Sequence, residues 1–111
     1  MIVAVADVYT QVPQRDAAEQ VMLRAQTAAR GEDGCVMFAF AQLLGEPGHY
    51  LLVSRWRDRA AFDAHYASAA FAEYQSTIAL LLVRDSELRV DTVQETVLPH
   101  DSSPLDIRQD D

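Results

Sequence analysis

The sequence predicts an α+β fold in which a four-stranded antiparallel sheet has helices packed on one face. Four short runs rich in β-branched and aromatic residues read as strands, and two regions with apolar residues at spacings of three and four read as helices. Their order is βαββαβ, with the second helical region split in two. This is the split βαβ, or ferredoxin-like, arrangement.

The first half of the chain supplies a strand, a helix and a second strand. Residues 2–9 (IVAVADVY) are too few and too rich in β-branched residues for a helix, so they predict a strand. Pro13 suits the first turn of a helix, and the amphipathic stretch after it ends at Gly31. The turn at 32–34 then leads into a second strand, 35–44 (CVMFAFAQLL).

The second half supplies a hairpin, the split helix and a last strand. Two glycines and a proline within residues 45–48 mark a hairpin before a third strand at 49–56. Asp58 can cap a short helix, and Ser68 can cap the next one. A fourth strand follows at 87–97 (ELRVDTVQETV).

We expect one domain over residues 1–98 and an acidic, flexible tail over 99–111. The tail holds four aspartates and one arginine, and the 111-residue chain has a formal net charge of −8. That sign argues against nucleic acid or anionic membrane as a partner, and no apolar run approaches the ~20 residues of a membrane span. The single cysteine, Cys35, cannot form an internal disulfide, which favours a reducing, cytoplasmic setting.

The predicted strands are apolar on both faces, which predicts a homodimer. In the first strand Val3 and Val5 oppose Ile2 and Ala4, and both faces of the second strand are apolar as well. A sheet covered by helices on one side only would leave a larger apolar patch than soluble monomers usually expose. A second copy would cover it and close the two sheets into a dimeric α/β barrel.

The segment 51–74 (LLVSRWRDRAAFDAHYASAAFAEY) resembles the antibiotic biosynthesis monooxygenase family of dimeric α+β barrel proteins. The matching frame is a strand ending in Trp56, followed by Asp58, Ala61, Phe62, Ala64 with His65, Ser68 and Phe71. The resemblance implies oxidation of phenols, anthrones or quinols by molecular oxygen without metal, flavin or haem. We therefore expect a small aromatic molecule and oxygen as partners, no cofactor and no metal site.

His65 is the candidate catalytic base of this chemistry. An unperturbed imidazole titrates near ~6.5, so it exchanges a proton at neutral pH, an effect worth roughly 10² to 10⁴ in rate. Packing within its short helix would explain His65 as well. The candidate substrate-binding residues are aromatic side chains that could wall a pocket for a planar ring: Trp56, Phe62, Tyr66, Phe71 and Tyr74. Burial of one helical face is the alternative for Phe62, Phe71 and Tyr74.

Asp7 is the last candidate, because an ionised carboxylate in an apolar strand needs a partner or a raised pKa. It either pairs with Arg55 or Arg89 across the sheet or faces the cavity as a proton acceptor.

Two positions depart from the family pattern. Ser54 stands where the family often has Glu, and Ala70 stands where many members have His. Two alternative functions therefore stay open. One is an isomerase or cyclase on the same fold, in which His65 moves protons and oxygen takes no part. The other is a non-catalytic small-ligand-binding or interaction protein.

Overall fold

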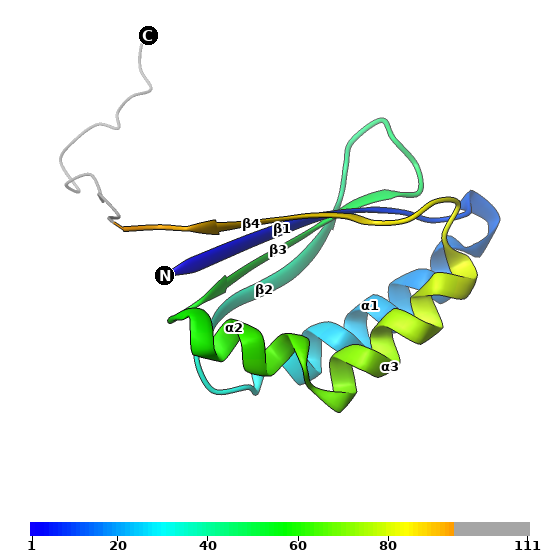
Figure 1. Cartoon of the computed structure of the whole chain (residues 1–111). Helices are drawn as coiled ribbons and strands as arrows, with labels where there is room; N and C mark the ends of the chain where they lie inside the picture. Colours follow the sequence, from blue (N-terminus) through cyan, green and yellow to red (C-terminus); the bar gives the residue numbers. More distant parts are fainter. Residues whose placement is uncertain (95–111) are drawn as a thin grey trace, which may run out of the picture.

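The computed structural model describes residues 1–94, which form a four-stranded antiparallel sheet with helices on one face (Figure 1). The strands are β1 (Ile2–Tyr9), β2 (Cys35–Gln42), β3 (His49–Trp56) and β4 (Glu87–Thr92), and the helices are α1 (Arg15–Arg30), α2 (Arg59–Tyr66) and α3 (Ala69–Ile78). Short 3-10 helices, η1 (Val12–Gln14) and η2 (Ala79–Leu81), precede α1 and follow α3. The strand order β2-β3-β1-β4 is that of the predicted ferredoxin-like fold.

Side chains at the predicted caps start the two short helices. A carboxylate oxygen of Asp58 accepts a hydrogen bond from the backbone N–H of Ala61 at 2.9 Å. The hydroxyl of Ser68 accepts one from the backbone N–H of Phe71 at 3.1 Å. Each cap satisfies an amide that has no partner within its helix, and such a cap is worth about 1 kcal/mol.

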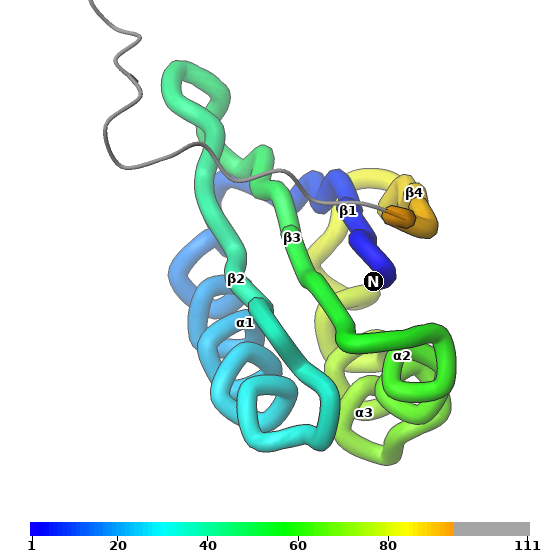
Figure 2. The backbone as a smooth tube through the Cα atoms, turned by 90° about the vertical axis from the view of Figure 1, so that its left-hand side faces the viewer, coloured from blue at the N-terminus to red at the C-terminus, as the bar shows by residue number. Residues whose placement is uncertain are grey.

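One face of the sheet packs on the helices, with α1 on the β2 side and α3 on the β4 side (Figure 2). Alternate residues of β1 and β3 are buried on this face, beginning with Ile2 and Tyr50. Phe38 and Phe40 of β2 also point to the helices, where Phe38 is 2% exposed. Both rings therefore belong to the core on the helix side.

The core on the helix side forms two clusters that meet at Phe40. The first lies around Trp56 and contains Ile2, Ala4, Ala6, Ala29, Phe38, Leu52, Ala61 and Phe62. The second lies between α1, α3 and the sheet and contains Val8, Ala18, Val21, Met22, Tyr50, Phe71, Tyr74 and Ile78. The first cluster holds α2 against the sheet, and the second holds α1 and α3.

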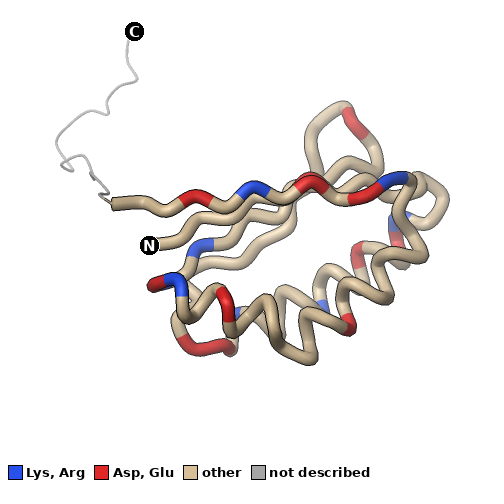
Figure 3. Tube along the Cα trace, in the orientation of Figure 1, with Lys and Arg blue, Asp and Glu red and all other residues tan. Residues whose placement is uncertain are grey.

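The helix-free face carries half-buried apolar side chains, including Val3, Val5, Leu51 and Val53. Figure 3 shows that charged residues are sparse along the central strands and alternate in sign along β4. The apolar character predicted for this face is therefore present on the surface of the single chain.

Two strands are shorter than predicted. β2 ends at Gln42 rather than at residue 44, because the chain turns at Leu43 into the hairpin loop. β4 ends at Thr92, whereas the predicted strand continued to residue 97. Residues 95–97 of the predicted strand, the domain boundary at residue 98 and the acidic tail lie outside the described residues.

Candidate functional site

His65 lies in the last turn of α2 with its ring in the protein interior. The helix buries Ala61, Phe62 and His65, and the imidazole is only 6% exposed. The imidazole stacks on the indole of Trp56, with ring centroids 4.5 Å apart and an angle of 29° between the planes. The ring of Phe71 lies 4.6 Å from the imidazole. The predicted base is therefore enclosed by aromatic rings.

A carboxylate orients this imidazole. Nδ1 of His65 lies 2.8 Å from Oε1 of Glu32, a residue of the loop between α1 and β2. An ionised carboxylate only accepts hydrogen bonds, so Nδ1 donates, and in the neutral form of the ring the lone pair is on Nε2. Sequence reasoning missed Glu32, since nothing in its local pattern distinguishes it from an ordinary loop residue.

The loop that carries Glu32 packs closely on α2. Gly34 has a φ of +81°, and a Cβ atom there would lie 2.5 Å from the Cβ of Ala61. The backbone N–H of Arg57 donates to the carbonyl of Gly34 at 2.8 Å, and the Arg57 guanidinium pairs with Asp33 at 3.1 Å. Hydrogen bonds from this guanidinium lower the pKa of the Asp33 carboxyl. These contacts bring the loop carboxylate to the imidazole.

A cavity of about 260 Å³ lies between the sheet and the α2–α3 region. Three of the predicted substrate-binding residues line it: Tyr66, Phe71 and Tyr74. Its other polar groups are the amide of Gln75 and the hydroxyl of Ser86. The remaining lining residues are apolar: Ala6, Val8, Leu52, Ile78, Leu82 and Leu88. Within residues 1–94 no charged side chain lines the cavity, so its chemistry suits a neutral, planar ligand.

Phe71 borders both this cavity and His65. Its ring lines the cavity and contacts the imidazole, which does not itself line the cavity. His65 instead borders a surface hollow of about 370 Å³, together with Glu32, Arg57 and Ser68. One aromatic side chain thus separates the candidate base from the candidate ring-binding cavity.

Two further predicted residues face away from the cavity. Trp56 is completely buried, and its Nε1 atom is the one buried side-chain nitrogen or oxygen without a hydrogen-bond partner in the described part of the chain. Phe62 borders a separate hollow beside β4, which it shares with Tyr66, Leu88 and Val90. The structure therefore gives Trp56 and Phe62 packing positions next to the cavity.

Asp7 lies on the opposite face of the sheet from the cavity. Its Oδ1 atom is 2.7 Å from Nε2 of His49, so its partner is neither Arg55 nor Arg89. The register explains the difference, since Arg55 and Arg89 stand opposite Val3 and Val5, towards the other end of β1. Asp7 is thus remote from the other candidate residues.

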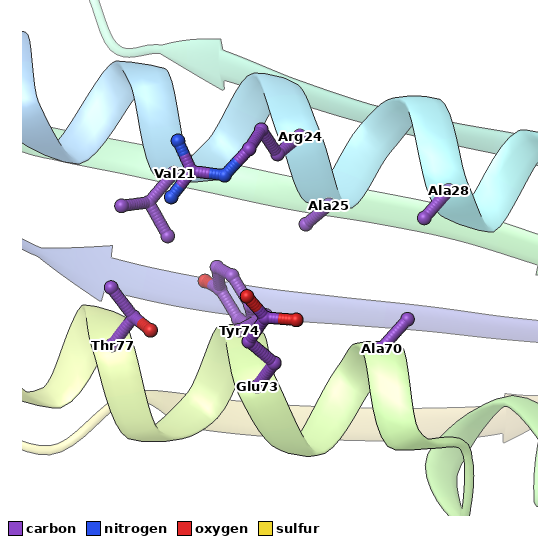
Figure 4. Close-up of a pocket in the computed structure, with 8 residues that line it drawn as sticks. All are labelled: Val21, Arg24, Ala25, Ala28, Ala70, Glu73, Tyr74 and Thr77. Carbon is purple, nitrogen blue, oxygen red and sulfur yellow. The ribbon is translucent and has the colours of Figure 1, made fainter.

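Tyr74 also borders the groove between α1 and α3 that Figure 4 shows. This groove has a volume of about 100 Å³, and the small side chains of Ala25, Ala28 and Ala70 flank it. Burial raises the pKa of the Tyr74 phenol, which keeps its hydroxyl protonated at neutral pH. Tyr74 therefore forms part of the wall between the groove and the cavity.

Across 1–94, no group of three or more His, Cys, Asp or Glu side chains is arranged to hold a metal ion. The longest helix there, α1, has 16 residues, and no described helix is both long and apolar enough to cross a membrane.

Solved structures share this fold. A Deinococcus radiodurans protein proposed to be an antibiotic biosynthesis monooxygenase superposes with a TM-score of 0.84 at 21% identity, covering 90% of this chain and 99% of that one. Rv0793 from Mycobacterium tuberculosis gives a TM-score of 0.79 at 24% identity, covering 87% of this chain and 98% of that one. At these identities the likeness concerns the fold alone.

Two sequence comparisons go further. The uncharacterized protein sll1783 of Synechocystis sp. is 30% identical over 84 residues, which cover 73% of this chain and 57% of the relative. The chain thus spans little more than half the length of that protein. The family model for antibiotic biosynthesis monooxygenases matches residues 1–77. The chain therefore belongs to the antibiotic biosynthesis monooxygenase family.

Proposed function

We propose that the cavity beneath α3 binds a small, neutral aromatic or quinol-type molecule, and that the protein is a cofactor-independent monooxygenase. The observation that carries this proposal is the cavity of about 260 Å³ with Phe71 and the phenols of Tyr66 and Tyr74 in its wall. Aromatic walls bind a flat ring, and neutral hydroxyls can hydrogen-bond to its oxygen atoms. Family membership supports the reaction type.

The reaction needs no reductant beyond the substrate. Removal of a proton from a phenol or an activated CH₂ group gives an electron-rich anion, which reduces molecular oxygen. For an activated CH₂ group, one oxygen atom replaces both hydrogens as a carbonyl, and the other leaves as water with those two hydrogens. The protein has to supply a proton acceptor and a cavity that excludes bulk water.

His65 is the proton acceptor in this proposal. Its Nδ1 atom is engaged by Glu32, so Nε2 holds the lone pair that accepts the proton. Because Phe71 borders both the imidazole and the cavity, proton transfer requires the Phe71 ring to move when substrate binds. Tyr66, Phe71 and Tyr74 bind the substrate ring.

A second copy of the chain is part of the proposal. Val3, Val5, Leu51 and Val53 give the helix-free face of the sheet an apolar centre that is only half-buried in one chain. A homodimer that packs two such faces together would remove them from water, at about 25 cal/mol per Å² of apolar area. The resulting dimeric barrel would also stiffen the sheet that forms the cavity floor.

A second candidate function is ligand binding without catalysis. The specific observation in its favour is that Phe71 borders the imidazole while His65 does not line the cavity. In a binding protein this ring would stay in place, and His65 would only fasten the loop through Glu32.

An oxygen-electrode screen against hydroquinones, naphthols and anthrones tests the reaction. We expect oxygen uptake by the wild-type protein, and a loss of about 10²-fold or more in His65→Gln. His49→Gln is the matched control, because it removes an imidazole from the opposite face of the sheet. Equal rates in both variants would remove His65 from the mechanism. Saturable ligand binding without oxygen uptake would favour the binding function.

A further inference from the structure

The loop of residues 43–48 between β2 and β3 rises above the sheet on the side away from the helices. Figure 1 shows it above the strands with the helices below, and Figure 2 shows the same relation after a quarter turn. Leu44 in this loop is 98% exposed, the highest value among the large apolar residues described. The loop on the helix-free side of the sheet thus carries an almost fully exposed apolar side chain.

Backbone contacts fix the shape of this loop. Gly45 and Gly48 have φ values of +76° and +84°, which side chains other than glycine rarely adopt. Gly48 lies so close to β1 that a Cβ atom would stand 2.7 Å from the carbonyl oxygen of Thr10. The backbone N–H and the hydroxyl of Thr10 both donate to the carbonyl of Gly48, at 2.7 Å and 3.2 Å.

Three charged side chains, which we call the clasp, connect the loop to the sheet: His49, Glu46 and Asp7. Nδ1 of His49 is 2.7 Å from Glu46 in the loop, and Nε2 is 2.7 Å from Asp7 on β1. Two ionised carboxylates can both accept only if both ring nitrogens carry hydrogens, so this geometry requires the imidazolium form. The His49 ring also stacks on the ring of Tyr9 at 4.4 Å, and the guanidinium of Arg84 lies over the Tyr9 ring. The loop is therefore held in a set position.

We propose that this loop, which we call the arm, packs against a second copy of the chain, with Leu44 as its apolar contact. This inference rests on the homodimer of the proposed function and adds to it the element that reaches across. The arm lies on the side of the sheet that the second copy would cover. That face also suits a copy of itself, because β4 presents Glu87, Arg89 and Asp91 in alternation and a two-fold axis can bring opposite charges together.

Sedimentation of the full chain over a range of concentrations tests the arm. We compare the wild type with Leu44→Ser and with a matched control, Leu80→Ser, which changes a leucine that is 78% exposed in η2. A two-fold dimer buries Leu44 twice, so Leu44→Ser should raise the dimer dissociation constant by at least about tenfold. Leu80→Ser should leave it within about threefold of the wild-type value.

The outcomes separate the arm from the dimer itself. If Leu44→Ser and Leu80→Ser raise the dimer dissociation constant equally, or if neither raises it, the proposed role of the arm is wrong. The homodimer itself is not contradicted by that result. A wild-type chain that stays monomeric at every concentration overturns both. Circular dichroism of each variant shows that the chain is folded, and because Leu44 is free of the core we expect unchanged spectra. Oxygen uptake, measured separately, tests the reaction independently of this result.

Discussion

The imidazole of His65 and the carboxylate of Glu32 form a 2.8 Å hydrogen bond across 33 residues of sequence. This bond joins the α1–β2 loop to α2 and sets which nitrogen of the ring is free. The same contact therefore serves stability and, in the proposed reaction, the placement of the proton acceptor.

Removing the Glu32 carboxylate should destabilise the fold. In Glu32→Ala the buried Nδ1–H loses its acceptor, which costs about 1–3 kcal/mol of unfolding free energy, whereas Glu32→Gln keeps a carbonyl acceptor and should cost less. Urea denaturation measures both values. Asp33→Ala is the control, because the neighbouring Asp33 carboxylate is 91% exposed and its ion pair is worth little. Equal losses in Glu32→Ala and Asp33→Ala would contradict this account.

The close packing of the same loop on α2 gives a second prediction. Gly34→Ala must both hold a positive φ and place a Cβ atom 2.5 Å from that of Ala61, whereas Gly45→Ala meets no atom within 4 Å at a similar φ. The backbone term alone is about 1 kcal/mol, so we expect Gly45→Ala to lose about that much and Gly34→Ala clearly more. Thermal unfolding of the two variants compares them directly. If both melt at the same temperature, the loop has room to move away from α2.

Much of the fold follows from local sequence signals. The observed bounds of β1 and β3 are the predicted ones, since β-branched and aromatic runs lie between clear turn residues. Asp58 and Ser68 cap their helices as expected, because capping depends only on residues three positions apart. The predicted second strand is two residues too long, because apolar Leu43 and Leu44 continue the strand pattern into the loop.

The candidate site was harder to predict because it depends on contacts between distant segments. The aromatic candidates and His65 are close in sequence. In the structure, however, Tyr74 and Phe71 of α3 line the cavity, whereas His65 borders a different hollow. Glu32 reaches His65 only because Gly34 lets its loop approach α2. The predicted pairing of Asp7 with Arg55 or Arg89 is wrong, because charge alone does not reveal the strand register that brings His49 close to Asp7.

His49 gives a pH dependence with a definite sign. Hydrogen bonds to Asp7 first, and then to Glu46, raise the pKa of His49 above its ordinary value of 6.5. Its stabilising contribution is therefore fully present below the unfolded pKa and is lost as pH rises through the higher folded pKa. We expect the unfolding free energy of the wild type to fall over this window relative to that of His49→Gln. Denaturation curves between about pH 5.5 and 9 measure it.

An NMR titration of the imidazole protons provides the companion measurement for this histidine. Asp7→Asn removes the largest cause of the shift, so the His49 midpoint should move down relative to the wild type. The charged groups around the ring that remain are Glu46, with Glu87 opposite Asp7 on β4 and Arg84 above Tyr9. A midpoint that does not change in Asp7→Asn would mean that this carboxylate does not set the charge of the clasp.

The uncharged cavity wall predicts a preference for neutral ligands that can be reversed. A buried carboxylate without a partner costs several kcal/mol, so 2-naphthol should bind the wild type at least about tenfold more tightly than 2-naphthoate at pH 7. Leu88 lines the cavity and is 45% exposed, so Leu88→Arg can place a cation at the rim while its stem stays packed. We expect calorimetry to show tighter naphthoate binding and little change for naphthol in this variant.

Val83→Arg, at a site that is 61% exposed and does not line the cavity, is the control. Tighter binding of naphthoate than of naphthol by the wild type would show that the ligand occupies a charged site elsewhere, such as the hollow beside Arg57.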